Sequence, residues 1–201
     1  MEEENLVLVH GLYTGGAFKG FRARRARAVA EHGEALGVRS YECVVASRRA
    51  MANRVLRLAR GTARAVDAAE VFEVDAEALR AALGTDTGRD GWQKMAGCAA
   101  DGLDSAACFT LLGTPRRLMA SGGRGQRVLW FGRGQAQLSE AAFVAHYTLQ
   151  HGPLVARYAP LIGLRRYTQV VAEESELCHA LQALGLGRAA APPVFAELVL
   201  T

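Results

Sequence analysis

His151 is the side chain of this sequence best suited to acid–base chemistry. An imidazole titrates near neutral pH, so it can give or take a proton during a reaction. Tyr147 precedes it by one helical turn and could orient a substrate oxygen. The competing interpretation is a core histidine hydrogen-bonded to a backbone carbonyl, with Tyr147 as an ordinary aromatic core residue.

A stripe of large side chains runs through His151 and predicts one wall of a cleft. In the run 138–167 they recur in steps of three and four, at Phe143, Tyr147, His151, Leu154, Tyr158 and Leu161. This spacing is typical of the buried face of an amphipathic helix. Ser139 is a suitable N-cap, and the helix should bend at Pro153, which lacks an amide hydrogen. We therefore expect Tyr147, Leu154 and Tyr158 to contact a substrate.

The flanking strands are expected to supply the opposite wall. Neighbouring strand residues point to opposite faces of a sheet, so only one of Arg166 and Tyr167 can face the helix. The stripe favours Tyr167 as a substrate contact. Trp130, on the preceding strand, is a further candidate for the cleft wall. An aromatic residue on a strand is also typical of a plain core.

The same stretch resembles the EthD family. The resemblance lies in Leu138-Ser139, Phe143, Tyr147, His151-Gly152-Pro153-Leu154-Val155 and Gly163-Leu164-Arg165-Arg166-Tyr167. EthD proteins belong to the dimeric α/β-barrel group, whose unit is a ferredoxin-like βαββαβ fold. The resemblance implies a cleft between helix and sheet that handles small, largely apolar or aromatic molecules, with His151 as its catalytic residue.

An internal repeat divides the chain into two copies of one unit. Residues 37–46, GVRSYECVVA, match residues 163–172, GLRRYTQVVA, at an offset of 126. Two further pairs of segments match at similar offsets, residues 5–9 with 127–131 and residues 69–72 with 196–199. The repeat predicts that both copies follow one path of strands and helices.

The first copy, residues 1–120, is predicted to be a complete ferredoxin-like half. We expect βαββαβ order, with strands at 6–9, 39–46, 69–74 and 107–112, helices at 18–36 and 75–83, and a polar insertion at 47–66. A Gly-rich linker follows at 121–126. The second half is predicted to begin at residue 127.

The second copy, residues 127–201, ends in its third strand and so lacks the last helix and strand of the motif. This leaves an open sheet edge at the strand 128–131, to be covered by this chain or by a second one. The predicted fold class is therefore α+β, with two ferredoxin-like halves forming a dimeric-α/β-barrel-like pseudo-dimer. A homodimer of such chains is the second possibility for assembly.

The first copy departs from the pattern where the chemistry would occur. Arg25 aligns with His151, and arginine stays charged and cannot shuttle protons near neutral pH. This predicts a degenerate half that completes the barrel. Arg25 also belongs to the basic run 19–27, KGFRARRAR, which we interpret as a solvated helix face rather than a nucleic-acid site.

Composition narrows the remaining classes. The 201 residues are 50% hydrophobic with a net charge of +4, and the four cysteines show no CxxC spacing. These features, with an acidic N-terminus and no long apolar run, favour a cytoplasmic globular protein without a metal site, disulfides or membrane contact. Walker, GxGxxG and GxSxG motifs are absent from the sequence.

The leading functional hypothesis is a cofactor-independent enzyme acting on a small aromatic or polyketide-like molecule. His151 would transfer a proton in a dehydration, cyclisation or oxidation, as a lyase or an oxidoreductase. The alternative is a non-catalytic ligand-binding or stress-related module that uses the same cleft. RNA binding is a third hypothesis, but neither first strand carries the exposed aromatic pattern that it requires.

Overall fold

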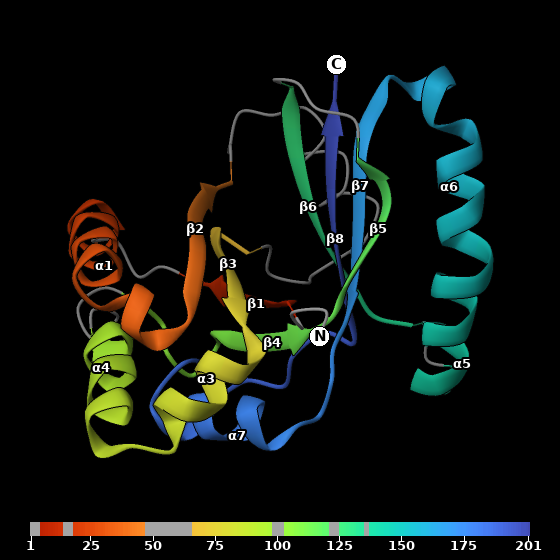
Figure 1. The fold of residues 1–201 in the computed structure, drawn as a ribbon. Helices are drawn as coiled ribbons and strands as arrows, with labels where there is room; N and C mark the ends of the chain where they lie inside the picture. The colour runs from red at the N-terminus through yellow and green to blue at the C-terminus, as the bar shows by residue number, and fades with distance from the viewer. Residues whose placement is uncertain (1–4, 14–17, 47–65, 98–102, 121–124, 135–136) are drawn as a thin grey trace.

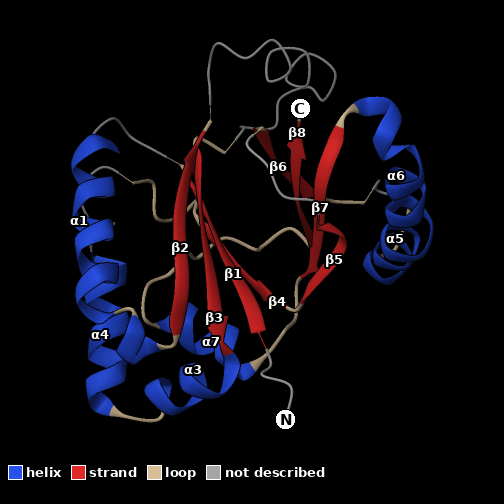
Figure 2. Ribbon diagram, turned by 45° about the horizontal axis from the view of Figure 1, so that its top comes forward, coloured by secondary structure: helices blue, strands red, loops and turns tan. Residues whose placement is uncertain are grey.

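The computed structural model describes residues 5–13, 18–46, 66–97, 103–120, 125–134 and 137–201. The predicted insertion at 47–66 and the linker at 121–126 lie almost entirely outside these residues. The described chain forms two four-stranded antiparallel sheets that face each other (Figure 1). Helices cover the outer face of each sheet, α1 and α4 on one side and α5 and α6 on the other (Figure 2).

The first half has the predicted ferredoxin-like fold. In chain order its elements are β1 (Asn5–Leu12), α1 (Phe18–His32), η1 (Glu34–Leu36), β2 (Val38–Val45), β3 (Ala68–Asp75), α3 (Ala76–Leu83), α4 (Asp86–Gly97) and β4 (Phe109–Gly113). The strands pair in the order β2-β3-β1-β4, as βαββαβ requires. Asp75 caps α3 as its sequence suggests, because its carboxylate accepts from the amide of Ala78 at 2.8 Å.

The second half forms most of the other sheet. Its own elements are β6 (Gln126–Gly132), α5 (Glu140–His146), the π-helical turn η2 (Tyr147–His151), α6 (Gly152–Tyr158), η3 (Ala159–Ile162), β7 (Leu164–Val171), α7 (Glu176–Ala183) and β8 (Val194–Leu200). Its sheet also includes β5 (Pro115–Ala120), from the end of the first half. The strands pair in the order β5-β7-β8-β6. As predicted, β6 is an edge of the described sheet.

The two copies follow the same strand–helix–strand–strand path. Gly37 and Gly163 end the equivalent helices with φ of 79° and 65°, a left-handed conformation that glycine adopts without strain. The strand registers correct the sequence alignment outside the central match. His10 pairs with Glu70 and Trp130 with Ala196, so His10 is the counterpart of Trp130. The sequence alignment is therefore wrong by two residues in the first strand and by one in the third.

Two elements that the sequence analysis did not predict tie the halves together. Strand β5 follows β4 directly, yet it joins the second sheet by pairing with β7. Helix α7 lies between β7 and β8, yet its Cys178 and Leu181 are buried in the core of the first half. Each half thus contributes one element to the other.

The core has three main layers, set by strand alternation. One lies between the first sheet and its helices and includes Leu8, Phe72 and Trp92. A second lies between the sheets, where residues such as Val9 and Phe195 meet. The third packs the second sheet against α5 and α6.

A π-helical turn interrupts the long helix of the second half at Tyr147–His151. Pro153 has no amide to donate, and the amide of Gly152 bonds the carbonyl of Tyr147, five residues back. The carbonyl of Thr148, freed by this shift, accepts from Arg116 of β5 at 2.7 Å. One extra residue in a turn rotates the following helix by about 100° relative to an uninterrupted α-helix.

This rotation overturns part of the predicted stripe. Beyond the turn the residues facing the sheet are Val155 and the fully buried Ala159. Leu154 and Tyr158, predicted to face the cleft, are instead 53% and 46% exposed. Tyr147 is therefore the last residue of the predicted stripe that lies on the buried face of the helix.

Candidate functional site

Three stacked rings form the centre of the predicted site. The indole of Trp130 on β6 stacks on Tyr147 with a centroid separation of 5.2 Å. The imidazole of His151 also stacks on Tyr147, at 5.2 Å and at an interplanar angle of 19°. Tyr147 is buried, whereas the His151 side chain is exposed. The structure thus brings the predicted residues together, but places His151 at the surface end of the stack rather than between helix and sheet.

Tyr167 lies beneath the stack, on the face of β7 that the sequence analysis assigned to it. It is buried, and its hydroxyl lies 3.5 Å from that of Tyr147. Gln169, which the sequence analysis missed, donates from Nε2 to the Tyr167 hydroxyl at 2.8 Å and to the Tyr147 carbonyl at 3.2 Å. Its Oε1 is buried without a hydrogen-bond partner among the described residues.

The electrostatics of His151 favour a neutral ring. Partial burial and the neighbouring His146 lower the pKa of His151 below its ordinary value of 6.5. A neutral imidazole has one nitrogen free to accept a proton. Among the described residues the His151 ring makes no hydrogen bond, and its ring contact is with Tyr147.

Leu154 and Tyr158 do not line a buried cleft. They belong to an exposed apolar set on the outer side of the helix that also includes Leu149, Leu161 and Ile162. Because they are exposed, their predicted role as substrate contacts would require a ligand bound at the surface of the helix. The sequence could not show this, because the residues alone do not reveal the added residue in the turn.

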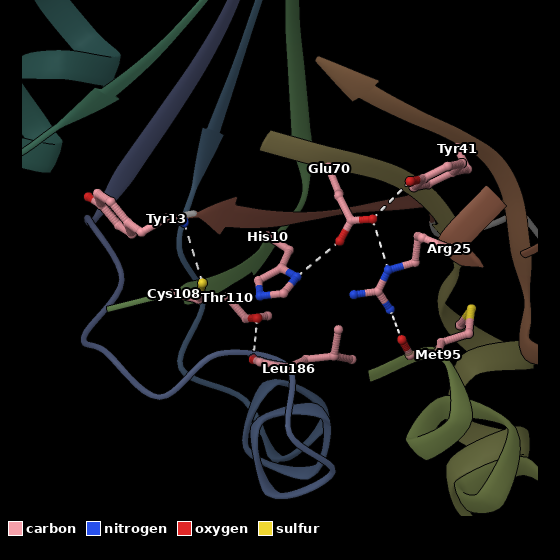
Figure 3. A network of polar contacts seen from close by, with 9 residues as sticks. All are labelled: His10, Tyr13, Arg25, Tyr41, Glu70, Met95, Cys108, Thr110 and Leu186. Atoms are coloured by element: carbon pink, nitrogen blue, oxygen red, sulfur yellow. Dashed lines mark hydrogen bonds and ion pairs between the residues drawn. The ribbon is translucent and has the colours of Figure 1, made fainter. Parts of the chain in front are cut away.

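The first half contains a buried charged cluster that the sequence analysis missed. Glu70 on β3 lies at its centre, with His10 Nδ1 at 3.1 Å and the Tyr41 hydroxyl at 2.8 Å (Figure 3). Arg25 reaches in from α1, and its Nε lies 2.9 Å from Glu70 Oε1. His10 is 1% exposed, and Arg25 and Glu70 are completely buried.

The remaining atoms of Arg25 are only partly satisfied. Nη1 donates to the carbonyl of Met95 at the end of α4. Nη2 of Arg25 and Nε2 of His10 are buried without hydrogen-bond partners among the described residues. Beside His10, Thr110 of β4 donates to the carbonyl of Leu186 (Figure 3).

The cluster holds Glu70 ionised and His10 neutral. Burial opposes ionisation of Glu70, but the charge of Arg25 and hydrogen bonds from His10 and Tyr41 outweigh it, so the pKa of Glu70 is lowered from 4.5. Burial lowers the pKa of His10 from 6.5, against the opposing effect of Glu70. The negative charge of Glu70 and the positive charge of Arg25 thus cancel.

A cavity of about 240 Å³ lies between the two sheets. Its apolar side includes Val7, Val170 and Phe195. On the polar side, Arg166 pairs with Glu197 at 2.7 Å and Arg117 with Glu73 at 3.4 Å. Since these charges already pair with each other, the cavity offers no unmatched charge to a ligand.

Two further observations concern the described residues only. They contain no helix that is long and apolar enough to cross a membrane. They also contain no group of three or more His, Cys, Asp or Glu side chains placed to hold a metal ion.

Comparison with known proteins finds similarity at the level of structure alone. No protein-family model and no curated protein sequence matches the chain. A Lactobacillus acidophilus protein provisionally described as a monooxygenase is 8% identical, with a TM-score of 0.47 over 98% of this chain and 77% of that one. A dimeric ferredoxin-like protein of unknown function from Jannaschia sp. CCS1 is 14% identical, with a TM-score of 0.32 over 54% of this chain and 96% of that one.

Proposed function

We propose that this protein binds a small aromatic molecule on the Trp130–Tyr147–His151 stack and exchanges a proton with it through His151. The observation that carries the proposal is the stack itself, which ends in an exposed imidazole. A planar ligand can extend such a stack by the offset arrangement that aromatic rings prefer. Leu154 and Tyr158 provide apolar surface on the same helix.

The lowered pKa of His151 supports a role as proton acceptor, because a neutral imidazole is the basic form at pH 7. The resemblance of residues 138–167 to the EthD family supplies the reaction class, a cofactor-independent dehydration, cyclisation or oxidation of a polyketide-like compound. In this scheme the His151 ring alone contacts the reacting atoms. Its position is supported by the packed aromatic residues Trp130, Tyr147 and Tyr167.

Ligand binding without catalysis is the second candidate. It is favoured because no described residue makes a hydrogen bond that orients the His151 ring, whereas catalytic imidazoles are usually held by a partner on the second nitrogen. RNA binding has less support. Ferredoxin-like RNA-binding proteins use an open sheet face, and here helices cover one face of each sheet while the other faces the second sheet.

Quenching of tryptophan fluorescence by 1-naphthol tests the binding site. Naphthol stacked on this site should quench Trp130, so the quenching should disappear in Trp130→Phe, which leaves the buried Trp92 as the remaining fluorophore. His151→Ala should weaken binding by roughly tenfold, as expected for loss of one aromatic contact. It should leave the stability within about 0.5 kcal/mol, because the side chain is exposed.

His179→Ala is the matched control, since His179 is an exposed histidine on α7. Equal naphthol affinity in the natural protein, His151→Ala and His179→Ala would refute the site. Binding that depends on His151, without turnover of any naphthol or polyketide analogue, would decide for the non-catalytic alternative.

A further inference from the structure

The charged cluster of the first half contains unused hydrogen-bonding capacity in a completely buried place. The Nη2 of Arg25 carries two N–H donors and cannot accept, so it requires an oxygen or an anion. Leaving such a charged donor without a partner costs free energy, because it loses its hydrogen bonds to water and gains none in return. Buried polar groups in native proteins are therefore nearly always satisfied by protein, water or ligand.

The bonding of His10 fixes which of its nitrogens is free. Ionised Glu70 can only accept, so the His10 Nδ1 that contacts it must donate. In the neutral ring this leaves Nε2 as an unprotonated nitrogen, with no partner among the described residues. A carboxylate that orients one nitrogen and leaves the other free is the arrangement found around working histidines.

We propose that Arg25 and His10 form a second binding site, enclosed in the first half, for the carboxylate of a small organic acid. The carboxylate accepts from Nη2 of Arg25 in a charge-assisted hydrogen bond. It also accepts from Nε2 of His10, which takes up a proton as the acid binds. Glu70 and Tyr41 position the two cationic groups and do not touch the ligand.

Charge balance explains the proton. Before binding, Glu70 and Arg25 compensate each other and His10 is neutral. An added anion would leave one negative charge unbalanced in the interior, which is strongly unfavourable. Protonation of His10 at Nε2 restores neutrality, since the ring then carries a positive charge between Glu70 and the ligand.

Two other titratable groups near the cluster, Tyr41 and Cys43, do not change this balance. Tyr41 on β2 stays protonated because burial and Glu70 raise its pKa. Cys43 on the same strand also stays protonated, since burial and Glu70 raise its pKa to about 11. On β4 the residue beside His10 is Thr110, whose hydroxyl donates to Leu186. Cys108, just before β4, lies 3.5 Å from the amide of Tyr13.

The second half provides a matched comparison within the same molecule. The strand pairing places Trp130 where the first half has His10, and Ala196 where it has Glu70. His151 takes the place of Arg25 four residues after an aromatic residue, Phe21 in the first half and Tyr147 in the second. The duplicated unit therefore has an enclosed, charged site in one copy and an open, aromatic site in the other.

Formate, the smallest carboxylate, is the probe for the test. In the natural protein labelled with ¹⁵N-histidine at pH 7, formate should move the His10 Nε2 resonance from the unprotonated to the protonated range. The resonance is assigned by its loss in His10→Gln. Calorimetry in two chloride-free buffers of different ionisation enthalpy should show about one proton taken up per formate bound, as the charge balance requires.

Arg25→Gln should weaken formate binding by roughly tenfold or more, because the charge-assisted hydrogen bond is lost. His151→Gln, the corresponding change in the second half, should leave both the affinity and the proton uptake unchanged. The proposal is overturned if the His10 resonance does not respond at formate concentrations below those that shift the exposed His32. The two free atoms would then bind water alone. It is equally overturned if formate binds without proton uptake, or with equal affinity to Arg25→Gln. The calorimetric readout uses the natural protein alone and so remains valid if a variant fails to fold.

Discussion

The charge of Arg25 is tolerated in the protein interior because Arg25 forms a buried ion pair with Glu70. In the sequence it lies among exposed arginines such as Arg22, Arg24 and Arg27, which do form a solvated face as predicted. Helical position alone could have indicated the difference, since Arg25 lies one turn after the buried Phe21. Its partners could not be foreseen, because His10 and Glu70 meet only when β1 and β3 pair.

The same cluster predicts how stability depends on pH. Folding lowers the pKa of His10 from 6.5 and that of Glu70 from 4.5, so the unfolded chain binds protons more readily at each site. Stability should therefore be complete above about pH 7 and fall on acidification. The loss due to His10 begins below its unfolded value near 6.5, and that due to Glu70 below its unfolded value near 4.5. Urea denaturation at a series of pH values measures both.

His10→Gln should remove the decline that begins near pH 6.5 while keeping the decline that begins near pH 4.5. Replacement of the exposed His32 by Gln is the control and should leave the profile as it is. A decline between these values that persists unchanged in His10→Gln would show that another group causes it.

The long helix of the second half shows what a sequence pattern can and cannot establish about an element. Its start at Ser139 is confirmed, since the hydroxyl accepts from the amide of Ala142 at 3.2 Å. A disturbance near Pro153 was also expected, but as a bend. The structure instead adds one residue to the turn, and that addition reverses the exposure of Leu154 and Tyr158. Side-chain spacing cannot distinguish a bend from an added residue, because both accommodate the absence of an amide hydrogen at Pro153.

Gly152 provides a test of how tightly this turn is packed. A Cβ at Gly152 would lie 2.8 Å from Gln169 Oε1 and 2.9 Å from Leu118 Cδ1. Gly152→Ala should therefore destabilise the protein by about 1–3 kcal/mol, despite the better helix propensity of alanine. Thermal unfolding gives the change in stability, and the emission of Trp130 reports whether the stack is disturbed.

Gly20→Ala is the matched control in α1, where the nearest atom to an added Cβ is the flexible end of Arg24. It should be neutral or stabilising by up to about 1 kcal/mol. Equal effects at the two glycines would contradict the close packing of Gly152 against Gln169.

Much of the overall architecture could be predicted from the internal repeat. A repeated segment predicts a repeated path, and the two sheets follow it, with Tyr41 and Tyr167 at equivalent positions. Strand β5 and helix α7 were missed for a physical reason. Each is short and is held by contacts with the opposite half. Strand β5 pairs with β7, and helix α7 inserts Leu181 into the core of the first half. Local sequence carries little information about such contacts.

This exchange predicts that the halves do not fold alone. Residues 1–120 would lose Cys178, Leu181 and Leu186 from their core and expose the apolar surface that these residues cover. We expect this fragment to lack a cooperative unfolding transition in circular dichroism. In the full chain, Leu181→Ala should cost about 2–5 kcal/mol, because the side chain is 0% exposed.

Leu149→Ala is the control for that substitution, since Leu149 is 70% exposed and should tolerate the change within about 0.5 kcal/mol. A fragment 1–120 that unfolds cooperatively with the stability of the whole protein would show that α7 is dispensable to the first half.

The direct passage from β4 into β5 has a kinetic consequence. In a dimer of separate subunits, a strand donated to the other sheet must find it by diffusion, so assembly accelerates with protein concentration. Here β4 ends at Gly113 and β5 begins at Pro115, so the donated strand is tethered to the sheet it leaves. The search is then governed by an effective local concentration set by the chain itself. Refolding should accordingly proceed at the same rate in dilute and in concentrated solution.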